Sequence, residues 1–165
     1  MTINVFGTES ASGKGTALIP LEAKRISGET DIDDSEQTES TAYVILTLTA
    51  PAEGAMDVSV WFDLAKATTG YAAVESTATI KFQLARKVDG TNYRIATDNP
   101  KGSVAISGTN AAGGAVAVDV GDLSASEVVQ IWIDMSADAT SDIELPYDVT
   151  YKSRGTITVT EVAAA

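Results

Sequence analysis

The sequence of 165 residues predicts an all-β fold: a single antiparallel β-sandwich, jelly-roll or immunoglobulin-like, with about nine or ten strands and an N-terminal arm. Most of the chain alternates apolar and polar residues, as half-buried strands do. Turn signals separate these segments by roughly 8 to 12 residues, the spacing typical of a sandwich. The chain has no cysteine and so forms no disulfides. With 44% hydrophobic residues, a chain of this length buries a sufficient core without them.

The strongest strand prediction covers residues 56–64, where apolar residues occupy every second position and Ser59, Trp61 and Asp63 lie between them. The same alternation predicts a strand over 41–50 that ends at Pro51. Residues 128–135 are β-branched and aromatic, which predicts a strand in the centre of its sheet.

Two hairpins are predicted. Asp89-Gly90 tolerates the positive φ of a two-residue turn and joins strands over 78–84 and 92–97. The glycine-rich segment 110–114 joins a short strand at 104–106 to one over 116–120. Further strands are expected at 147–151 and 157–159.

The N-terminal segment differs from the rest, so the chain divides into residues 1–28, an arm with the first strands, and a sandwich body over 29–165. Residues 7–16 are small or polar, which predicts a flexible arm. The segment carries +1 charge against −13 for the body, so it can lie on a neighbour's acidic surface. Ile3, Val5 and Lys14 are its candidate contact residues. The chain start has no basic and apolar export signal.

Composition excludes several classes of function. A net charge of −12 repels phosphate backbones and anionic lipid heads, so we expect neither nucleic acid nor a membrane as partner. The chain has no histidine and no cysteine, the usual groups for proton transfer, nucleophilic attack and tight metal binding. We therefore expect a protein that is not an enzyme and carries no cofactor.

One acidic segment has the residue types of a calcium loop. Asp31, Asp33 and Glu39 are candidate ligands, because they lie two or more residues apart and offer carboxylate oxygens. The loop pattern also needs a glycine where Glu36 stands and a glutamate where Ala42 stands. A solvated acidic loop without metal is therefore the preferred interpretation.

Two tryptophans occupy positions that polar residues hold in the alternating pattern of their strands. Such positions face solvent, so we predict that both rings are exposed. Trp61 and Trp132 can stack on a sugar, anchor a subunit interface or be covered by another segment of the chain. Tyr71 and Tyr93 follow the same argument more weakly. These four aromatic residues complete the candidate interface.

The small, acidic, cysteine-free β-sandwich rich in Ala, Thr, Val and Gly, with an N-terminal arm, resembles phage head decoration or cement proteins. The resemblance implies a virion structural protein on the capsid surface, or otherwise an extracellular one. Its implied partners are the major capsid protein or other copies of itself, most simply as a trimer. A carbohydrate-binding or adhesion module is the alternative, with the tryptophans as platforms. A third interpretation is a filament subunit that donates the strand Thr2–Phe6.

Overall fold

The computed structural model describes residues 10–19, 36–37, 43–67, 78–87, 93–95, 102–107, 110–111, 114–135 and 142–161. Within these ranges the protein is all-β, with two antiparallel sheets packed face to face as a sandwich. The one helical segment described is a 3-10 turn, η2 (Leu64–Lys66). The predicted fold class is therefore confirmed at this level.

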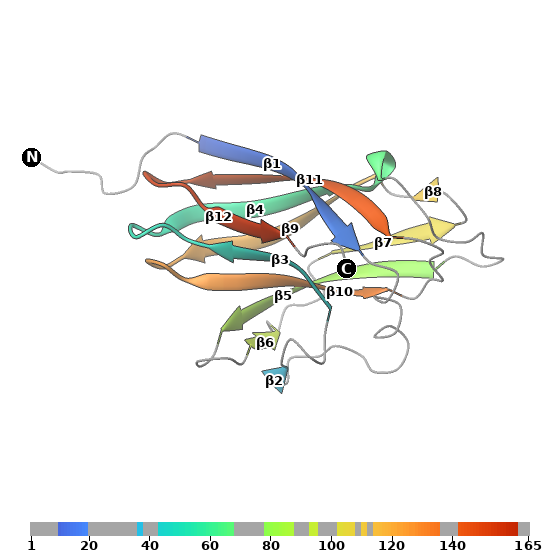
Figure 1. Ribbon diagram of the computed structural model, residues 1–165, viewed down its shortest axis with the longest axis horizontal. Helices are drawn as coiled ribbons and strands as arrows, with labels where there is room; N and C mark the ends of the chain where they lie inside the picture. Colours follow the sequence, from blue (N-terminus) through green and yellow to red (C-terminus); the bar gives the residue numbers. More distant parts are fainter. Residues whose placement is uncertain are drawn as a thin grey trace, which may run out of the picture.

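Four long strands form the first sheet, in the order β1-β11-β4-β9. Their bounds are β1 (Ser10–Ile19), β4 (Ala55–Asp63), β9 (Ala115–Leu123) and β11 (Ile143–Lys152). We call this layer the four-stranded sheet. β1 forms one of its edges (Figure 1).

In the facing sheet the order is β12-β3-β10-β5, and β7 pairs with β5 on the side away from β10. The four main strands of this larger sheet are β3 (Tyr43–Thr49), β10 (Val128–Met135), β5 (Ala78–Lys87) and β7 (Gly102–Ser107). Four strands of two to four residues add to it: β2 (Glu36–Gln37), β6 (Tyr93–Ile95), β8 (Asn110–Ala111) and β12 (Thr158–Glu161). The described sandwich body thus has eight strands, and the prediction of nine or ten is wrong.

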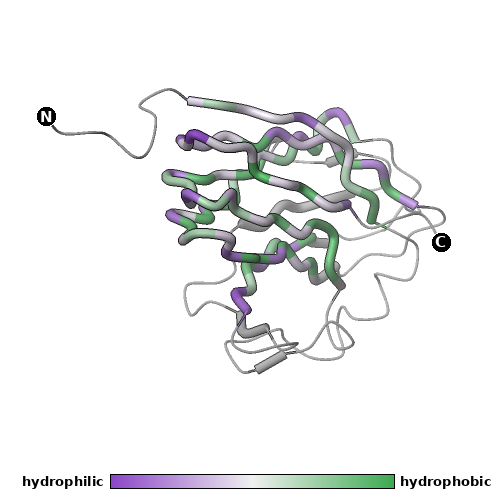
Figure 2. Tube along the Cα trace, turned by 60° about the vertical axis from the view of Figure 1, so that its left-hand side comes forward, coloured by the Kyte–Doolittle hydropathy of each residue, from purple (hydrophilic) through white to green (hydrophobic). Residues whose placement is uncertain are grey.

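Alternation along the strands produces the core. Val58, Val60 and Phe62 of β4 point inward and are buried, as are the alternate residues of β10. Figure 2 shows hydrophobic and hydrophilic positions alternating along the described strands. At the centre, the rings of Phe62 and Phe82 stack across the two sheets with centroids 4.6 Å apart. The strands predicted at β3, β4, β5, β10 and β11 are confirmed, and β10 lies between β3 and β5 as expected of a central strand.

Two predictions about local structure differ from what is observed. Residues predicted as a flexible arm instead include β1, which pairs with β11 along all ten of its residues. The expected hairpin between 104–106 and 116–120 is also wrong, because β7 pairs with β5 in one sheet and β9 with β4 in the other. Alternation determines which face a residue occupies, but it does not determine the partner strand.

An arginine joins the two layers near one end of the sandwich. The guanidinium of Arg86, on β5, pairs with the carboxylate of Glu127 and donates a second hydrogen bond of 2.7 Å to the carbonyl of Val120, on β9. Glu127 precedes β10 in the turn that leaves β9. A rigid planar fork makes both contacts at once, so this side chain holds the turn against both sheets.

Candidate functional site

Trp61 projects from the outer face of the four-stranded sheet. Its neighbours along β4, Val60 and Phe62, point into the core, so the pleat directs the indole outward, where 47% of the residue is exposed. Among the described residues, Met56 is the only other large hydrophobic side chain that is exposed, at 37%. It lies near the opposite end of β4. The indole is thus an isolated apolar surface.

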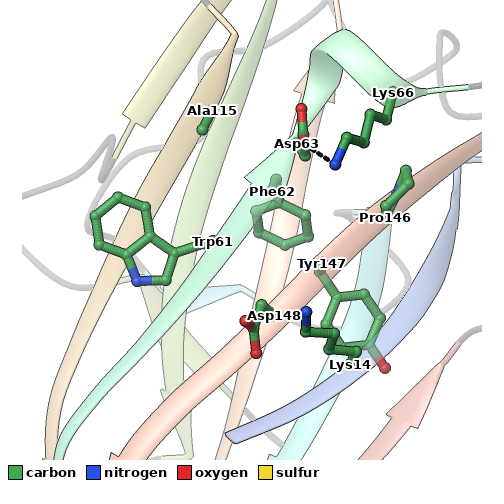
Figure 3. A pocket seen from close by; sticks show the side chains of 9 residues that line it. All are labelled: Lys14, Trp61, Phe62, Asp63, Lys66, Ala115, Pro146, Tyr147 and Asp148. Atoms are coloured by element: carbon green, nitrogen blue, oxygen red, sulfur yellow. Dashed lines mark ion pairs between the residues drawn. The ribbon is translucent and has the colours of Figure 1, made fainter.

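Strand pairing places three different side chains in one row across this face. Asp148 on β11 is paired with Trp61 on β4, and Lys14 on β1 is paired with Asp148. On the other side of Trp61, the paired residue on β9 is Ala117. Figure 3 shows the indole, the carboxylate and the lysine following one another across the strands. Strand register therefore places an aromatic ring (Trp61), a hydrogen-bond acceptor (Asp148) and a hydrogen-bond donor (Lys14) on adjacent strands.

A shallow hollow of about 270 Å³ lies at this row. Its lining comes from all four strands and from η2: Lys14, Trp61, Phe62, Asp63, Lys66, Ala115, Pro146, Tyr147 and Asp148. At the η2 end of the hollow, Lys66 Nζ lies 3.5 Å from Asp63 Oδ2, and both side chains are exposed (Figure 3). The four ionisable side chains Lys14, Lys66, Asp63 and Asp148 sum to zero charge.

The polar groups of the hollow are not all satisfied. Oδ1 of Asp148 is buried and has no hydrogen-bond partner. Lys14 is exposed and takes part in none of the ion pairs formed among the described residues. A buried acceptor without a donor costs free energy, and a ligand that donates a hydrogen bond recovers it when the carboxylate turns this oxygen toward the hollow. The hollow can therefore bind a ligand that has one apolar face and carries hydroxyl groups.

The base of the hollow is held by a bridge between the sheets. Tyr147 is buried beneath the β1–β11 pair, and its hydroxyl donates a hydrogen bond to Oε1 of Glu161 on β12. Burial first, and then the hydrogen bond and the negative charge of Glu161, raise the pKa of the phenol well above its ordinary value near 10. A Cβ at Gly15, the residue paired with Tyr147, would overlap the phenol oxygen and Glu161 Oε1. Only glycine leaves room for the ring here.

Trp132 differs from Trp61, although both occupy polar phases of alternating strands. Its side chain has no exposed surface and packs with Ala85, Val44 and Val128 on the outer face of the larger sheet. The indole Nε1 donates a 2.8 Å hydrogen bond to Oε1 of Gln130. Of the three interpretations of Trp132, the structure agrees with the one in which other parts of the chain cover the ring. The expectation that this ring is exposed is wrong.

The other predicted residues are not assembled at the hollow. Ile3, Val5 and Tyr71, and the candidate calcium ligands Asp31, Asp33 and Glu39, lie outside the described residues. Tyr93 belongs to β6 of the larger sheet, and its side chain is likewise outside the description. Within the described ranges, no three acidic, histidine or cysteine side chains gather as metal ligands would. The same residues include no helix with the length and apolar character that crossing a bilayer requires.

The site therefore joins two residues that the sequence analysis named to several that it missed. Trp61 and Lys14 were candidates, whereas Asp148, Asp63, Lys66 and the small Ala115 were not. Asp148 lies between Tyr147 and Val149 in an alternating strand, so the sequence pattern could have predicted that its side chain points outward. Its place beside Trp61 depends on the β11–β4 pairing, which no local pattern reveals.

Comparison with known proteins adds little to this site. No family model and no curated protein matches the chain. Among solved structures, the chain is similar to the CBM22-1-GH10 modules of the Clostridium thermocellum endo-1,4-beta-D-xylanase 10B, determined in complex with xylohexaose. The TM-score is 0.28 and the identity 12% over 94% of this chain, which spans 27% of that one. A likeness this distant carries no argument about ligand or activity.

Proposed function

We propose that this chain is a non-catalytic jelly-roll recognition module that binds carbohydrate on the outer face of its four-stranded sheet. The exposed indole of Trp61 is the observation that carries the proposal. The C–H face of a pyranose ring is apolar and packs against an aromatic ring, while its hydroxyls need donors and acceptors at the rim. In the lining of the hollow, Asp148 and Asp63 supply acceptors and Lys14 and Lys66 supply donors.

The order of the strands supports the jelly-roll part of the proposal. We set aside β12 and the three strands of two or three residues and number the remaining strands along the chain. The four-stranded sheet then holds the first, eighth, third and sixth strands, and the larger sheet holds the second, seventh, fourth and fifth. Two interlocked Greek keys give this alternation between sheets.

The surroundings of Trp61 favour a sugar over a protein partner. A stable protein interface needs a buried apolar centre with several aromatic or aliphatic anchors on each side. Here a single indole lies among charged and small side chains, and Met56 is separated from it along β4. A small polar ligand with one apolar face matches such a surface better.

The arrangement favours binding without catalysis. Glycoside hydrolysis needs one carboxylic acid that an apolar environment keeps protonated, opposite a second carboxylate. The hollow contains two carboxylates, and each has a lysine beside it: Asp63 is ion-paired with Lys66, and Asp148 is paired by register with Lys14. A carboxylate beside a lysine does not have the apolar surroundings that a general acid of this kind requires.

A virion decoration protein is the second candidate function, and one observation favours it. β1 is ten residues long and forms the edge of its sheet in the described structure, so its outer backbone groups are available to another chain. Such pairing would join copies of the protein or attach it to a capsid protein. This candidate has the acidic, cysteine-free composition in its favour as well.

Binding to an array of neutral glycans tests the main proposal, followed by titration of the best ligand. Trp61→Ala should weaken binding at least about tenfold, because the variant loses the stacking surface. Met56→Ala removes the other large hydrophobic side chain that is exposed among the described residues, so it is the matched control and should leave affinity unchanged. Emission from the buried Trp132 reports that each variant is folded. Affinity that is unaffected by Trp61→Ala would contradict the proposal.

The two candidates separate by a second measurement. The carbohydrate module should bind its glycan as a monomer, as judged by mass from light scattering. A protein that binds no glycan and elutes as a trimer, or that attaches to purified capsids, would instead support the decoration function.

A further inference from the structure

We infer that the site takes an interior stretch of a neutral glycan chain, with at least two consecutive pyranose rings lying across the strands, one on Trp61 and the next over Asp148 toward Lys14. This inference rests on the proposed carbohydrate function and specifies its ligand. It is carried by the row that the register places at right angles to the strands.

The length of the row exceeds one ring. Neighbouring strands are about 4.8 Å apart, so Trp61 on β4 and Lys14 on β1 are separated by about 10 Å along the sheet. Asp148 on β11 lies halfway between them. A ring seated on the indole reaches the carboxylate with its substituents, but the lysine lies beyond it. A second ring, seated past the carboxylate, lies over Lys14.

Among the residues that the structure describes, none closes either end of the row, as a continuing polymer needs. On the β9 side of Trp61 the small Ala115 and Ala117 leave the platform without a wall. On the β1 side, Ser12 and Gly13 next to Lys14 are exposed and also small. A pocket for a chain end would be closed on one side, whereas this hollow is a shallow face lined from all four strands.

The unsatisfied polar groups match a pair of sugar hydroxyls. Asp148 Oδ1 lacks a donor, and the χ2 torsion of an aspartate is soft, so the carboxylate can turn either oxygen toward the hollow. Lys14 can donate to the oxygen of a neighbouring hydroxyl, since its ammonium has three donors and no acceptor. One hydroxyl donates to Asp148 and the next accepts from Lys14, and this second contact falls on the second ring.

Charge selects a neutral chain over an acidic one. The four ionisable groups of the hollow sum to zero, so the site offers no net attraction to a carboxylate or sulfate. The whole chain carries −12 and repels a polyanion as it approaches. Uronic-acid and sulfated polymers are therefore expected to bind more weakly than neutral ones.

The test is a chain-length series. The probes are glucose, galactose, mannose and xylose with their β-1,4-linked oligomers of two to six rings, followed through Trp61 emission and calorimetry. For the best series, affinity should rise at least about tenfold from one ring to two. Lys14→Ala should abolish this gain, so that two rings bind no more tightly than one. Asp148→Ala should weaken both, and Asp148→Asn, which keeps one carbonyl acceptor, should weaken them less.

Lys87→Ala, which removes an exposed lysine from β5 of the larger sheet, is the matched charge control and should bind as the unmodified protein does. Equal affinity for one ring and for six would overturn the inference while leaving the carbohydrate function intact. A gain from the second ring that survives Lys14→Ala would also overturn it. Failure of every glycan to bind would instead overturn the proposed function together with the inference.

Discussion

Because of the hydrogen bond between Tyr147 and Glu161, we expect the folding stability of this protein to fall at alkaline pH. The phenol is buried and donates to a carboxylate, so its pKa in the folded protein is raised above the value near 10 that it has in the unfolded chain. The bridge is fully present below pH 10. Above that pH the unfolded chain releases the phenolic proton and the folded protein retains it, so folding stability falls as pH rises.

The magnitude follows from the difference in bound protons. One proton held only by the folded state lowers the free energy of unfolding by about 1.4 kcal/mol per pH unit well above pH 10, which gives a loss of about 1.4 kcal/mol at pH 11. Tyr147→Phe removes the titrating group while it keeps the ring. At pH 8 we expect the variant to be less stable by about 1 kcal/mol, because the hydrogen bond is lost.

Urea unfolding at pH 8 and pH 11, followed through the emission of Trp132, measures both effects. All other ionisable groups are the same in the two proteins, so their contribution cancels in the comparison. The unmodified protein should lose about 1.4 kcal/mol more than the variant between the two pH values. Equal losses in the two proteins would refute the argument that burial and Glu161 hold the proton on Tyr147.

Three further substitutions probe the scaffold. Gly15→Ala should destabilise by about 1 to 3 kcal/mol in urea unfolding, because its Cβ displaces the phenol of Tyr147; no change would contradict the tight approach. Arg86→Ala should lower the free energy of unfolding by about 1 kcal/mol in the same assay. Arg86→Lys should lower it less, because lysine keeps the ion pair with Glu127 and loses the hydrogen bond to Val120. Phe82→Ala should lower stability by about 3 to 5 kcal/mol in thermal unfolding, because it empties the stacked centre of the core; a loss below 1 kcal/mol would argue against that packing.

The sequence predicted what depends on local alternation. β4 and β10 were expected from their period of two, and their inward residues form the observed core. β1 was missed because a strand of small residues, with Gly13 and Gly15 in it, resembles a linker. Glycine is needed at position 15 because the ring of Tyr147 packs over it. This contact joins residues far apart in the sequence, so no local pattern predicts it.

The candidate site was predicted in part for the same reason. Period-two alternation identified Trp61 as outward, but it gave the same answer for Trp132, whose face is covered. The immediate neighbours along each strand do not separate the two. Trp132 lies between Gln130 and Asp134, and Trp61 lies between Ser59 and Asp63. The row with Lys14 required the strand order, which the sequence alone does not specify.

The burial of Trp132 means that the two sides of the sandwich are not equivalent. On the larger sheet the outward positions Ala85, Gln83 and Gln130 are closed to water, and on the four-stranded sheet the corresponding positions are open. Under the proposed function, each copy would offer its ligand one flat side. Avidity for a long polymer would then have to come from several copies held with the same side outward, at a spacing set by whatever carries them.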